Sequence, residues 1–491
     1  PYTTLFRSLY ETRWDNWGPR AGLAYRLRND FVVRSGFGVT YTPTNTGYFG
    51  GPYYFGAQNF ALRTTAPEAL LFGPTPQGAV VVPFNRSTVL NPIIGANPNA
   101  PQYYGAGDNE PRFDREGMRN GKILQWNFFV EKRLGRDWKA EVGYSGARGY
   151  HLQLGRFNMN GDQDLPDSLL NQWRSQYIAS NGTNPATVQV ANPFQPASGP
   201  LIPFNGVFAN RTVPLRNIVL QYPLQPNNLV GAPLGFYTYN ALMAQLQKSF
   251  SSGLMLNVHY TWSRTIELWG SEAQNNNYAE NAGLQTFNVN RRDLSNSYFI
   301  SPNDIPHRLV GTFVWSPQFG AGKKWSTNNR FADALLGGWN FGGVVIAQSG
   351  QPQQGFTGPT GSILGLGDRI PGVPIEVPKE LQRWYTGAST AERTVTLPSG
   401  RQVVVCRYCF LKYSSDAFRG RTVTFPNGNT GADIYWFGTA AHRYGDIRGN
   451  GRFNVNMSLQ REFSLYEGLK LQFSAEATNF LNNAQFRPQL A

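Results

Sequence analysis

The stretch between Tyr239 and Ser263 alternates apolar and polar residues on both sides of a short turn. It reads YNALMAQLQKSF, then SSG, then LMLNVHYTWS. An alternation with a period of two is typical of a β-strand whose two faces meet different surroundings. Two such runs joined by Ser-Ser-Gly predict a hairpin. Each run has roughly ten residues, the length that a tilted strand needs to cross a bilayer.

Alternating runs of the same kind recur along the chain, and we expect about ten strands, mostly in hairpins. The connections at one end of these hairpins are short, whereas those at the other end are long, rich in Gly, Pro and Asn, and expected to be irregular. The longest irregular segment is expected between Ser349 and Asn450. The expected strands cover residues 20–28, 31–41, 123–134, 138–146, 239–250, 254–263, 307–315, 339–348, 452–463 and 469–477.

This rhythm of short and long connections indicates the fold class. Long structureless loops disfavour a compact soluble domain, while short periplasmic turns and long extracellular loops are typical of outer-membrane barrels. The sequence therefore predicts an all-β fold, part of a large antiparallel transmembrane β-barrel. Its expected partner is the lipid of the outer membrane.

Charged and aromatic residues on the apolar faces support this interpretation. Lys132, Lys248 and Arg461 each lie within a few residues of a short turn, where a long side chain can reach the lipid headgroups. Aromatic residues lie toward the strand ends, as interfacial girdles require. A soluble sandwich explains the alternation but neither placement. The residues assigned to the membrane interface are Trp126, Trp138, Tyr260, Trp262, Trp315 and Trp339.

Composition excludes several other classes of protein. Aromatic residues make up 14% of the 491 residues and charged residues 15%, which disfavours disorder driven by charge. The formal net charge is +14, but Lys and Arg are scattered without a run of five, so we expect no nucleic-acid partner. The sequence contains no run of about 18 apolar residues, so it predicts no transmembrane helix. A closed barrel nevertheless satisfies its backbone within a membrane.

Motifs for catalysis and cofactor binding are absent from the sequence. It contains no GxSxG, HExxH or P-loop pattern. The four histidines are too widely spaced to form a typical metal site. We therefore expect a protein that is not an enzyme, with no catalytic, cofactor or metal residues.

Cys406 and Cys409 form a CxxC pattern in the last long connection. The surrounding sequence, VVVCRYCFLK, matches neither a haem attachment site nor half of a paired zinc site. In an oxidising setting at the cell surface, a local disulfide is the expected state. Two free thiols are the alternative, and a redox-active pair is a third.

A cluster of aromatic residues lies in the first long connection, among glycines. Exposed aromatic rings of this kind can stack on sugars or peptides, so we consider them candidate ligand contacts. The first interpretation remains that such loops pack on one another. The cluster comprises Tyr48, Phe49, Tyr53, Tyr54 and Phe55.

The strand segments together resemble the C-terminal barrel of TonB-dependent outer-membrane receptors, specifically the Oar-like branch. The resemblance implies a bacterial outer-membrane location and energy-coupled uptake of a scarce nutrient such as a siderophore, oligosaccharide or peptide. It also implies an extracellular ligand, and a TonB complex reached through a plug that this chain lacks. The alternatives are an adhesion or structural barrel and a secreted soluble carbohydrate-binding β-protein. The matching segments include PRAGLAYRL, WNFFVEKRLG, YNALMAQLQKSFSSGL, DIPHRLVGTFVW, LLGGWNFGGVVIAQSGQP and FNVNMSLQREF.

The resemblance also implies how the chain relates to a complete receptor. Such receptors carry an N-terminal domain, a plug and a barrel of about 22 strands ending in an aromatic residue. We therefore expect residues 9–491 to be a partial barrel that lacks the plug, the N-terminal domain and the final strand. Residues 1–8, PYTTLFRS, resemble the translation of a sequencing adapter, and we expect them to be an artefact.

Overall fold

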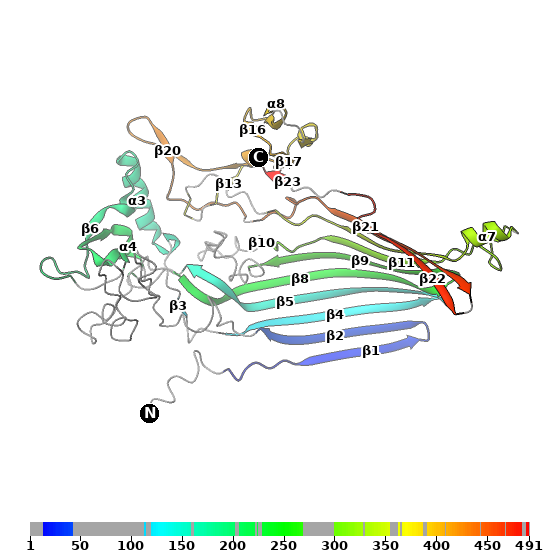
Figure 1. Cartoon of the computed structure of the whole chain (residues 1–491). Coiled ribbons are helices and arrows are strands. Elements are labelled where there is room, and N and C mark those ends of the chain that lie inside the picture. Colours follow the sequence, from blue (N-terminus) through cyan, green and yellow to red (C-terminus); the bar gives the residue numbers. More distant parts are fainter. Residues whose placement is uncertain are drawn as a thin grey trace, which may run out of the picture.

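One antiparallel sheet organises the computed structural model (Figure 1). None of its described helices is long and apolar enough to cross a membrane. The structure describes residues 13–42, 112–113, 119–158, 162–201, 206–220, 223, 228–268, 299–327, 329–353, 362–363, 366–385, 390–407, 409–441, 443–466, 468–483 and 488–490.

Ten long strands follow one another through this sheet in chain order, each antiparallel to its neighbours. Two short strands add to this sheet: β3 (Arg112–Phe113) pairs with β8, and β10 (Phe299–Ile300) pairs with β9. The predicted fold class is therefore confirmed, and each of the ten expected strands is present. The long strands are β1 (Arg20–Arg28), β2 (Phe31–Thr42), β4 (Gly121–Leu134), β5 (Trp138–Asn158), β8 (Asn228–Ser251), β9 (Leu254–Glu267), β11 (His307–Trp315), β12 (Trp339–Gln348), β21 (Arg452–Tyr466) and β22 (Leu469–Ala477).

The connections divide the sheet into two ends. At the end that we call the turn end, β8 and β9 are joined by Ser252 and Gly253 alone, and both have positive φ (50° and 78°). The turn is shorter than the predicted Ser-Ser-Gly, because Ser251 still pairs with Leu254. Such left-handed pairs match the twist of the strands they join. The opposite end, the loop end, carries the long connections.

Strands β5 and β8 extend well past their predicted ends. Both continue at the loop end, where Leu152 pairs with Gly235 and is fully buried. A Cβ on Gly235 would lie 2.6 Å from the Leu152 carbonyl oxygen, so the absent side chain permits this approach. The prediction stopped short because the regular apolar alternation ends there, while the two strands continue to satisfy each other's backbone groups.

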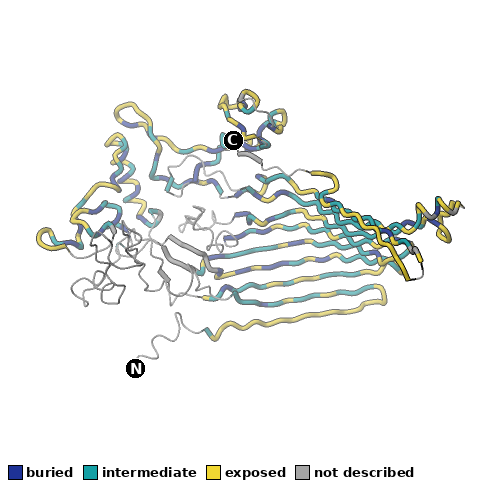
Figure 2. The backbone as a smooth tube through the Cα atoms, in the orientation of Figure 1, coloured by how far each residue is buried: buried dark blue, intermediate teal, exposed yellow. Residues whose placement is uncertain are grey.

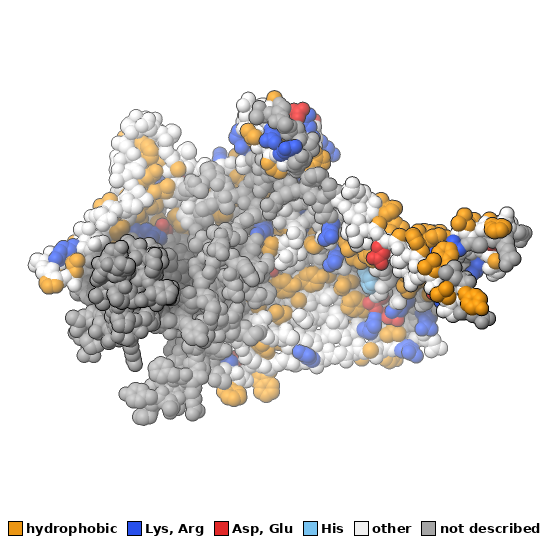
Figure 3. Space-filling model, in the orientation of Figure 1, with side chains coloured by type: hydrophobic (Ala, Val, Ile, Leu, Met, Phe, Trp, Pro, Cys, Tyr) orange, Lys and Arg blue, Asp and Glu red, His pale blue; other side chains and the backbone are white. Residues whose placement is uncertain are grey.

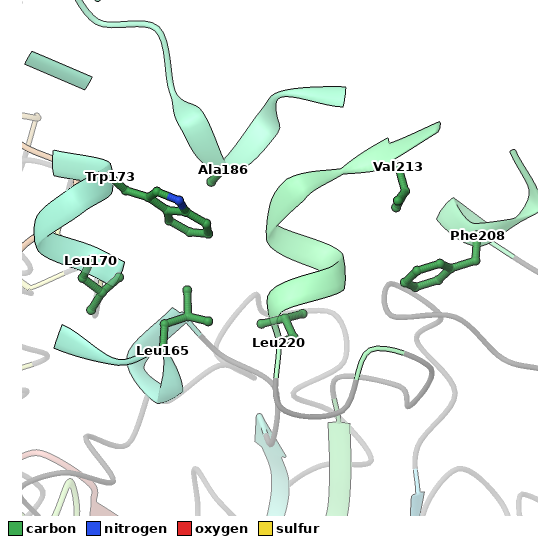
Figure 4. Close-up of a cluster of buried hydrophobic side chains, with 7 residues drawn as sticks. All are labelled: Leu165, Leu170, Trp173, Ala186, Phe208, Val213 and Leu220. Atoms are coloured by element: carbon green, nitrogen blue, oxygen red, sulfur yellow. The ribbon is translucent and has the colours of Figure 1, made fainter. Parts of the chain in front are cut away.

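Two of the long connections, those that follow β5 and β12, contain folded structure, so the expectation that these two are irregular was wrong. Helix α3 (Asp167–Ala179) buries Leu170, Trp173 and Tyr177 on one face. Leu170 and Trp173 join a cluster with residues of the following segments (Figure 4). The other elements are α4 (Leu215–Val219), α8 (Thr390–Arg393), β6 (Gln189–Ala191), β7 (Thr212–Pro214), β13 (Asp368–Arg369), β14 (Trp384–Tyr385), β15 (Thr394–Thr396), β16 (Gln402–Val404), β17 (Cys409–Tyr413), β18 (Phe418–Arg419), β19 (Thr422–Thr424), β20 (Thr430–Ala432) and β23 (Pro488–Leu490), with 3-10 turns at Asp162–Asp164, Pro185–Thr187, Gly206–Ala209, Lys379–Leu381 and Ser415–Ala417.

These folded connections form what we call the loop layer, residues 162–220 and 362–447. Its two parts hold each other: Arg174 Nε donates to Asp433 Oδ2 at 2.8 Å, and the rings of Tyr177 and Phe425 lie 5.5 Å apart. Four clusters of buried apolar residues lie within it. By contrast, β1 at the sheet edge is exposed along its whole length (Figure 2). Much of the packed core therefore lies in the loops rather than against the sheet.

Candidate functional site: a two-faced sheet and a pocket at its loop end

The register of the sheet brings the apolar positions of neighbouring strands into continuous rows. Tyr260 on β9, for example, pairs with Ala244 on β8 and with Leu309 on β11. Because side chains alternate between the faces of each strand, residues paired in this way share one face. One row that crosses the sheet comprises Val130, Val142, Ala244, Tyr260, Leu309, Ala347 and Phe453.

Within the described part of the chain, large side chains on this face have no protein core against them. Leu242 is 43% exposed and Trp262 is 56% exposed, although both lie on central strands. An apolar surface that continues over many strands would be strongly unfavourable in water. Hydrocarbon surroundings remove that cost, and we therefore name this side the lipid face.

The opposite face carries charged and amide side chains within the strands as well as at their ends. Arg34 pairs with Glu131 at 3.1 Å and with Glu141, while Lys139 Nζ lies 3.7 Å from Glu131. Further across the sheet, Gln245 Nε2 donates to Asn257 Oδ1 at 3.0 Å. Such groups require water or polar protein as neighbours. We call this side the polar face, and it is suited to line an aqueous or protein-filled interior.

All six aromatic residues assigned to the membrane interface lie in rows of the lipid face. Trp138, Trp315 and Trp339 occupy strand ends next to turn-end connections. The other three lie in rows nearer the loop end. Along β9, Leu254, which pairs with Trp315, is eight residues from Trp262. For a strand tilted by about 40° from the barrel axis, this separation corresponds to about 20 Å along that axis. This approaches the apolar band of about 25 Å in such barrels, and the interfacial role remains our proposal.

The charged residues on the lipid face differ from expectation. Lys248 is buried, and its Nζ donates to the Ser251 carbonyl at 2.8 Å and the Leu254 carbonyl at 3.0 Å. Arg461 is also buried, and its Nη1 donates to the Leu335 carbonyl at 2.6 Å. Both point toward the turn end, but they bind backbone carbonyls of the turn-end connections rather than reaching free headgroups. Lys132 is exposed.

A pocket of about 520 Å³ lies where the lipid face meets the loop end. Tyr144, Leu242 and Trp262 form its apolar wall, and Arg264 and Arg448 contribute cationic groups. Tyr144 Oη donates to Asn240 Oδ1 at 2.5 Å beside this wall. The volume suits a small ligand, but the apolar wall belongs to the lipid face, so we do not assign this pocket to a route through the barrel.

The polar side of this pocket is a buried ion pair that sequence reasoning missed. Arg448 Nη2 donates to Asp304 Oδ2 at 2.5 Å, and Arg448 Nη1 donates to the Asp304 and Gly350 carbonyls. The other carboxylate oxygen of Asp304, which is 1% exposed, accepts from the Thr265 amide at 2.6 Å. Asp304 thus links the last residues of β9 to the segment before β21. The two residues are 144 positions apart in the sequence, and no local pattern predicts their contact.

Within the loop layer, Asp368 shows how buried carboxylates are kept charged. Burial alone would raise the pKa of Asp368, but hydrogen bonds from Arg421 at 2.9 Å and Thr439 Oγ1 at 2.8 Å hold that pKa below its ordinary value. A carboxyl with a lowered pKa in the folded state stabilises the fold above its unfolded-state pKa. This contribution to stability is therefore present at neutral pH, and it is lost as the pH falls through the folded-state pKa of Asp368.

The remaining predicted residues divide into two groups. Cys406 and Cys409 have Cα atoms 5.3 Å apart and are joined as a disulfide in the structure, within the usual range for such bonds. The aromatic cluster of Tyr48, Phe49, Tyr53, Tyr54 and Phe55 lies outside the described residues. Within the described part of the chain, no group of three His, Cys, Asp or Glu residues could hold a metal ion.

Comparison with known proteins supplies a family. The model of the outer membrane beta barrel domain matches residues 3–490. A comparison with curated proteins gives no match. Among solved structures, the chain is similar to the ferripyoverdine receptor of the outer membrane of Pseudomonas aeruginosa, with 8% identity, 95% of this chain and 29% of that chain covered, and a TM-score of 0.33.

Two further structures show the same level of similarity. The ferric preacinetobactin receptor BauA from Acinetobacter baumannii has 8% identity and a TM-score of 0.34, with 96% of this chain and 33% of that chain covered. The outer membrane transporter YddB from Escherichia coli has 6% identity and a TM-score of 0.32, with 92% and 35% covered. The chain therefore spans about a third of the length of these structures.

The Arg448–Asp304 pair generates the first prediction. Arg448→Ala leaves the buried carboxylate of Asp304 without its cation, which should destabilise the attachment of the loop layer by about 3–5 kcal/mol. The matched control is Arg401→Ala, which breaks a more exposed pair with Asp416 and should cost less than about 1 kcal/mol. Hydrogen exchange of the Thr265 amide should accelerate in Arg448→Ala alone. Equal protection in both variants would contradict the role assigned to Arg448.

The disulfide between Cys406 and Cys409 gives a second prediction. A membrane-impermeant maleimide applied to intact cells should label neither cysteine before reduction and both after it. Labelling of both residues without reductant would show that the pair is free thiols.

Proposed function

Because the chain belongs to the outer membrane β-barrel domain family, we propose that it is part of a transporter that takes up a scarce nutrient across the bacterial outer membrane. The outer membrane is its location. The proposed energy source is a TonB complex, reached through a plug in the remainder of the receptor. Within this class, the quoted strand segments support the Oar-like branch.

The polar face is the observation that carries this proposal. It presents the Arg34, Glu131, Glu141 and Lys139 network opposite the lipid face, which suits a wet or plugged interior. In the described residues, β1 pairs with β2 and β22 pairs with β21, and the two edge strands do not pair with each other. We propose that these ten strands are part of a barrel of more strands, and wide barrels can hold a channel or a plugged lumen.

The loop layer supports an extracellular ligand. It forms a folded surface at the loop end, and loops at this end face the exterior in outer-membrane barrels. We propose a siderophore, an oligosaccharide or a peptide as the ligand class. We also propose the aromatic cluster around Tyr53 as a contact for that ligand, by stacking of its rings.

An adhesion or structural barrel is the second candidate. The size of the loop layer favours it, because a folded surface with its own apolar clusters can also bind a partner cell or matrix. The alternative of a secreted soluble β-protein is wrong, because the family is one of the outer membrane and the lipid face is extensively exposed.

Uptake by living cells separates transport from adhesion. Cells that express the full-length protein are given an iron-loaded siderophore, a labelled oligosaccharide or a labelled peptide, with and without a protonophore. We expect one probe to accumulate inside the cells, and the protonophore to reduce its uptake to the level of surface binding. Binding without internal accumulation, unchanged by the protonophore, would contradict transport and favour adhesion.

A further inference from the structure

The connection between β11 and β12, residues 316–338, differs from the other turn-end connections in the described sheet. It contains helix α7 (Arg330–Leu336), which lies beyond the sheet at the turn end (Figure 1). Phe331 is 88% exposed and Leu335 is 69% exposed, and Leu336 and Trp325 are exposed as well. Figure 3 shows hydrophobic side chains gathered at this end of the molecule, over β22 and α7. So much exposed apolar surface in a short segment requires a partner.

The helix is a fixed scaffold for these side chains. The Asn329 side chain caps it by accepting from the amides of Phe331 at 3.0 Å and Ala332 at 3.2 Å. Asp333 accepts from the hydroxyl of Ser326, the Thr327 amide at 2.7 Å and the Thr327 hydroxyl at 2.8 Å. These hydrogen bonds lower the pKa of Asp333, so its carboxylate stays charged and bound. The exposed residues are therefore held in place by the fold.

The end of α7 is attached to the lipid face itself. The carbonyl of Leu335 accepts from Trp339 Nε1 at 2.9 Å and from Arg461 Nη1 at 2.6 Å. Trp339 and Arg461 pair with each other across β12 and β21 in a row of the lipid face. The apolar surface of α7 therefore begins where the lipid-facing rows of the sheet end.

The charges of the connection complement a lipid surface. Lys323 and Lys324 are exposed, and Lys324 Nζ lies 5.5 Å from the centre of the Trp325 ring. The sole acidic residue of the connection is Asp333, which is buried and hydrogen-bonded. Lysines beside exposed Trp, Phe and Leu residues are typical of segments that lie in the headgroup region of a bilayer.

We propose that the β11–β12 connection is an in-plane membrane anchor that inserts into the periplasmic leaflet of the outer membrane. Phe331 and Leu335, four residues apart on one side of α7, enter the acyl region together with Leu336. Lys323 and Lys324 lie at the lipid phosphates. The partner is phospholipid rather than another protein, because the apolar surface continues the lipid face and its charges suit phosphate. The anchor would fix the turn end at a defined depth in the membrane.

Spin labels measure this depth directly. Phe331→Cys and Leu335→Cys are introduced separately into the full-length protein with its Cys406–Cys409 pair oxidised, and the labelled proteins are folded into phosphatidylcholine vesicles. Val258→Cys, in the middle of the lipid face, is the positive control. Met255→Cys is the matched control, because Met255 is also apolar, exposed and near the turn end, but lies on the polar face.

Collisions with oxygen report lipid, and collisions with a water-soluble nickel chelate report water. We expect the labels at 331 and 335 to meet oxygen more than nickel, as at 258, whereas the label at 255 does not. Greater access to nickel at 331 and 335 would overturn the anchor. Low access to both reagents would also overturn it, since another protein surface would then cover the helix.

The lysines are tested by lipid composition. Replacing one quarter of the phosphatidylcholine by phosphatidylglycerol should move the label at 331 deeper, and the double change Lys323→Gln and Lys324→Gln should abolish that shift. A shift that survives the double change would overturn the assignment of the two lysines to lipid phosphates. These measurements do not depend on a transported substrate, so the anchor can fail while the transport proposal holds, and the reverse.

Discussion

The structure depends on one constraint: backbone N–H and C=O groups inside a bilayer must find partners within the protein. Long paired strands meet that constraint, and the register shifts between them lie toward the turn end or the loop end. The same pairing fixes every side chain to one of two faces, because a slip of one residue would exchange them. Tyr260 lies between Ala244 and Leu309 for this reason, and Asn257 lies opposite them among polar groups. The lipid face and the polar face are two consequences of one hydrogen-bonding pattern.

Beyond the bilayer, the constraint relaxes and other interactions decide the structure. At the loop end, water and side chains can satisfy the backbone, so the chain forms helices and small sheets around several apolar clusters. Asp304 and Arg448 tie that layer back to the end of β9. At the turn end, α7 is held by Trp339 and Arg461 of the lipid face. Both ends are therefore joined to the sheet by hydrogen bonds, which involve the Thr265 amide at the loop end and the Trp339 and Arg461 side chains at the turn end.

The sequence predicted the strands well because alternation is a local signal that the bilayer imposes. It predicted the lipid-facing positions of Trp262 and Trp339 for the same reason. It did not predict α3, because the buried face of this helix packs against Tyr435 and Phe437, which are more than two hundred residues away in the sequence. Nor did it predict Arg448 with Asp304, or the carbonyl partners of Lys248 and Arg461, because those contacts depend on loop positions that no repeating pattern specifies.

The contact between the apolar face and lipid is the central claim, and three substitutions measured together test it. Free energies of folding into vesicles are compared for Val258→Lys, Asn257→Lys and Leu246→Trp in the full-length protein. Facing lipid, Val258→Lys should cost about 2–4 kcal/mol, while Asn257→Lys on the polar face and Leu246→Trp beside Val258 should cost little. A packed core would instead penalise Leu246→Trp by about 1–3 kcal/mol through overpacking. A large loss for Leu246→Trp, or for Asn257→Lys, would contradict the assignment of the two faces.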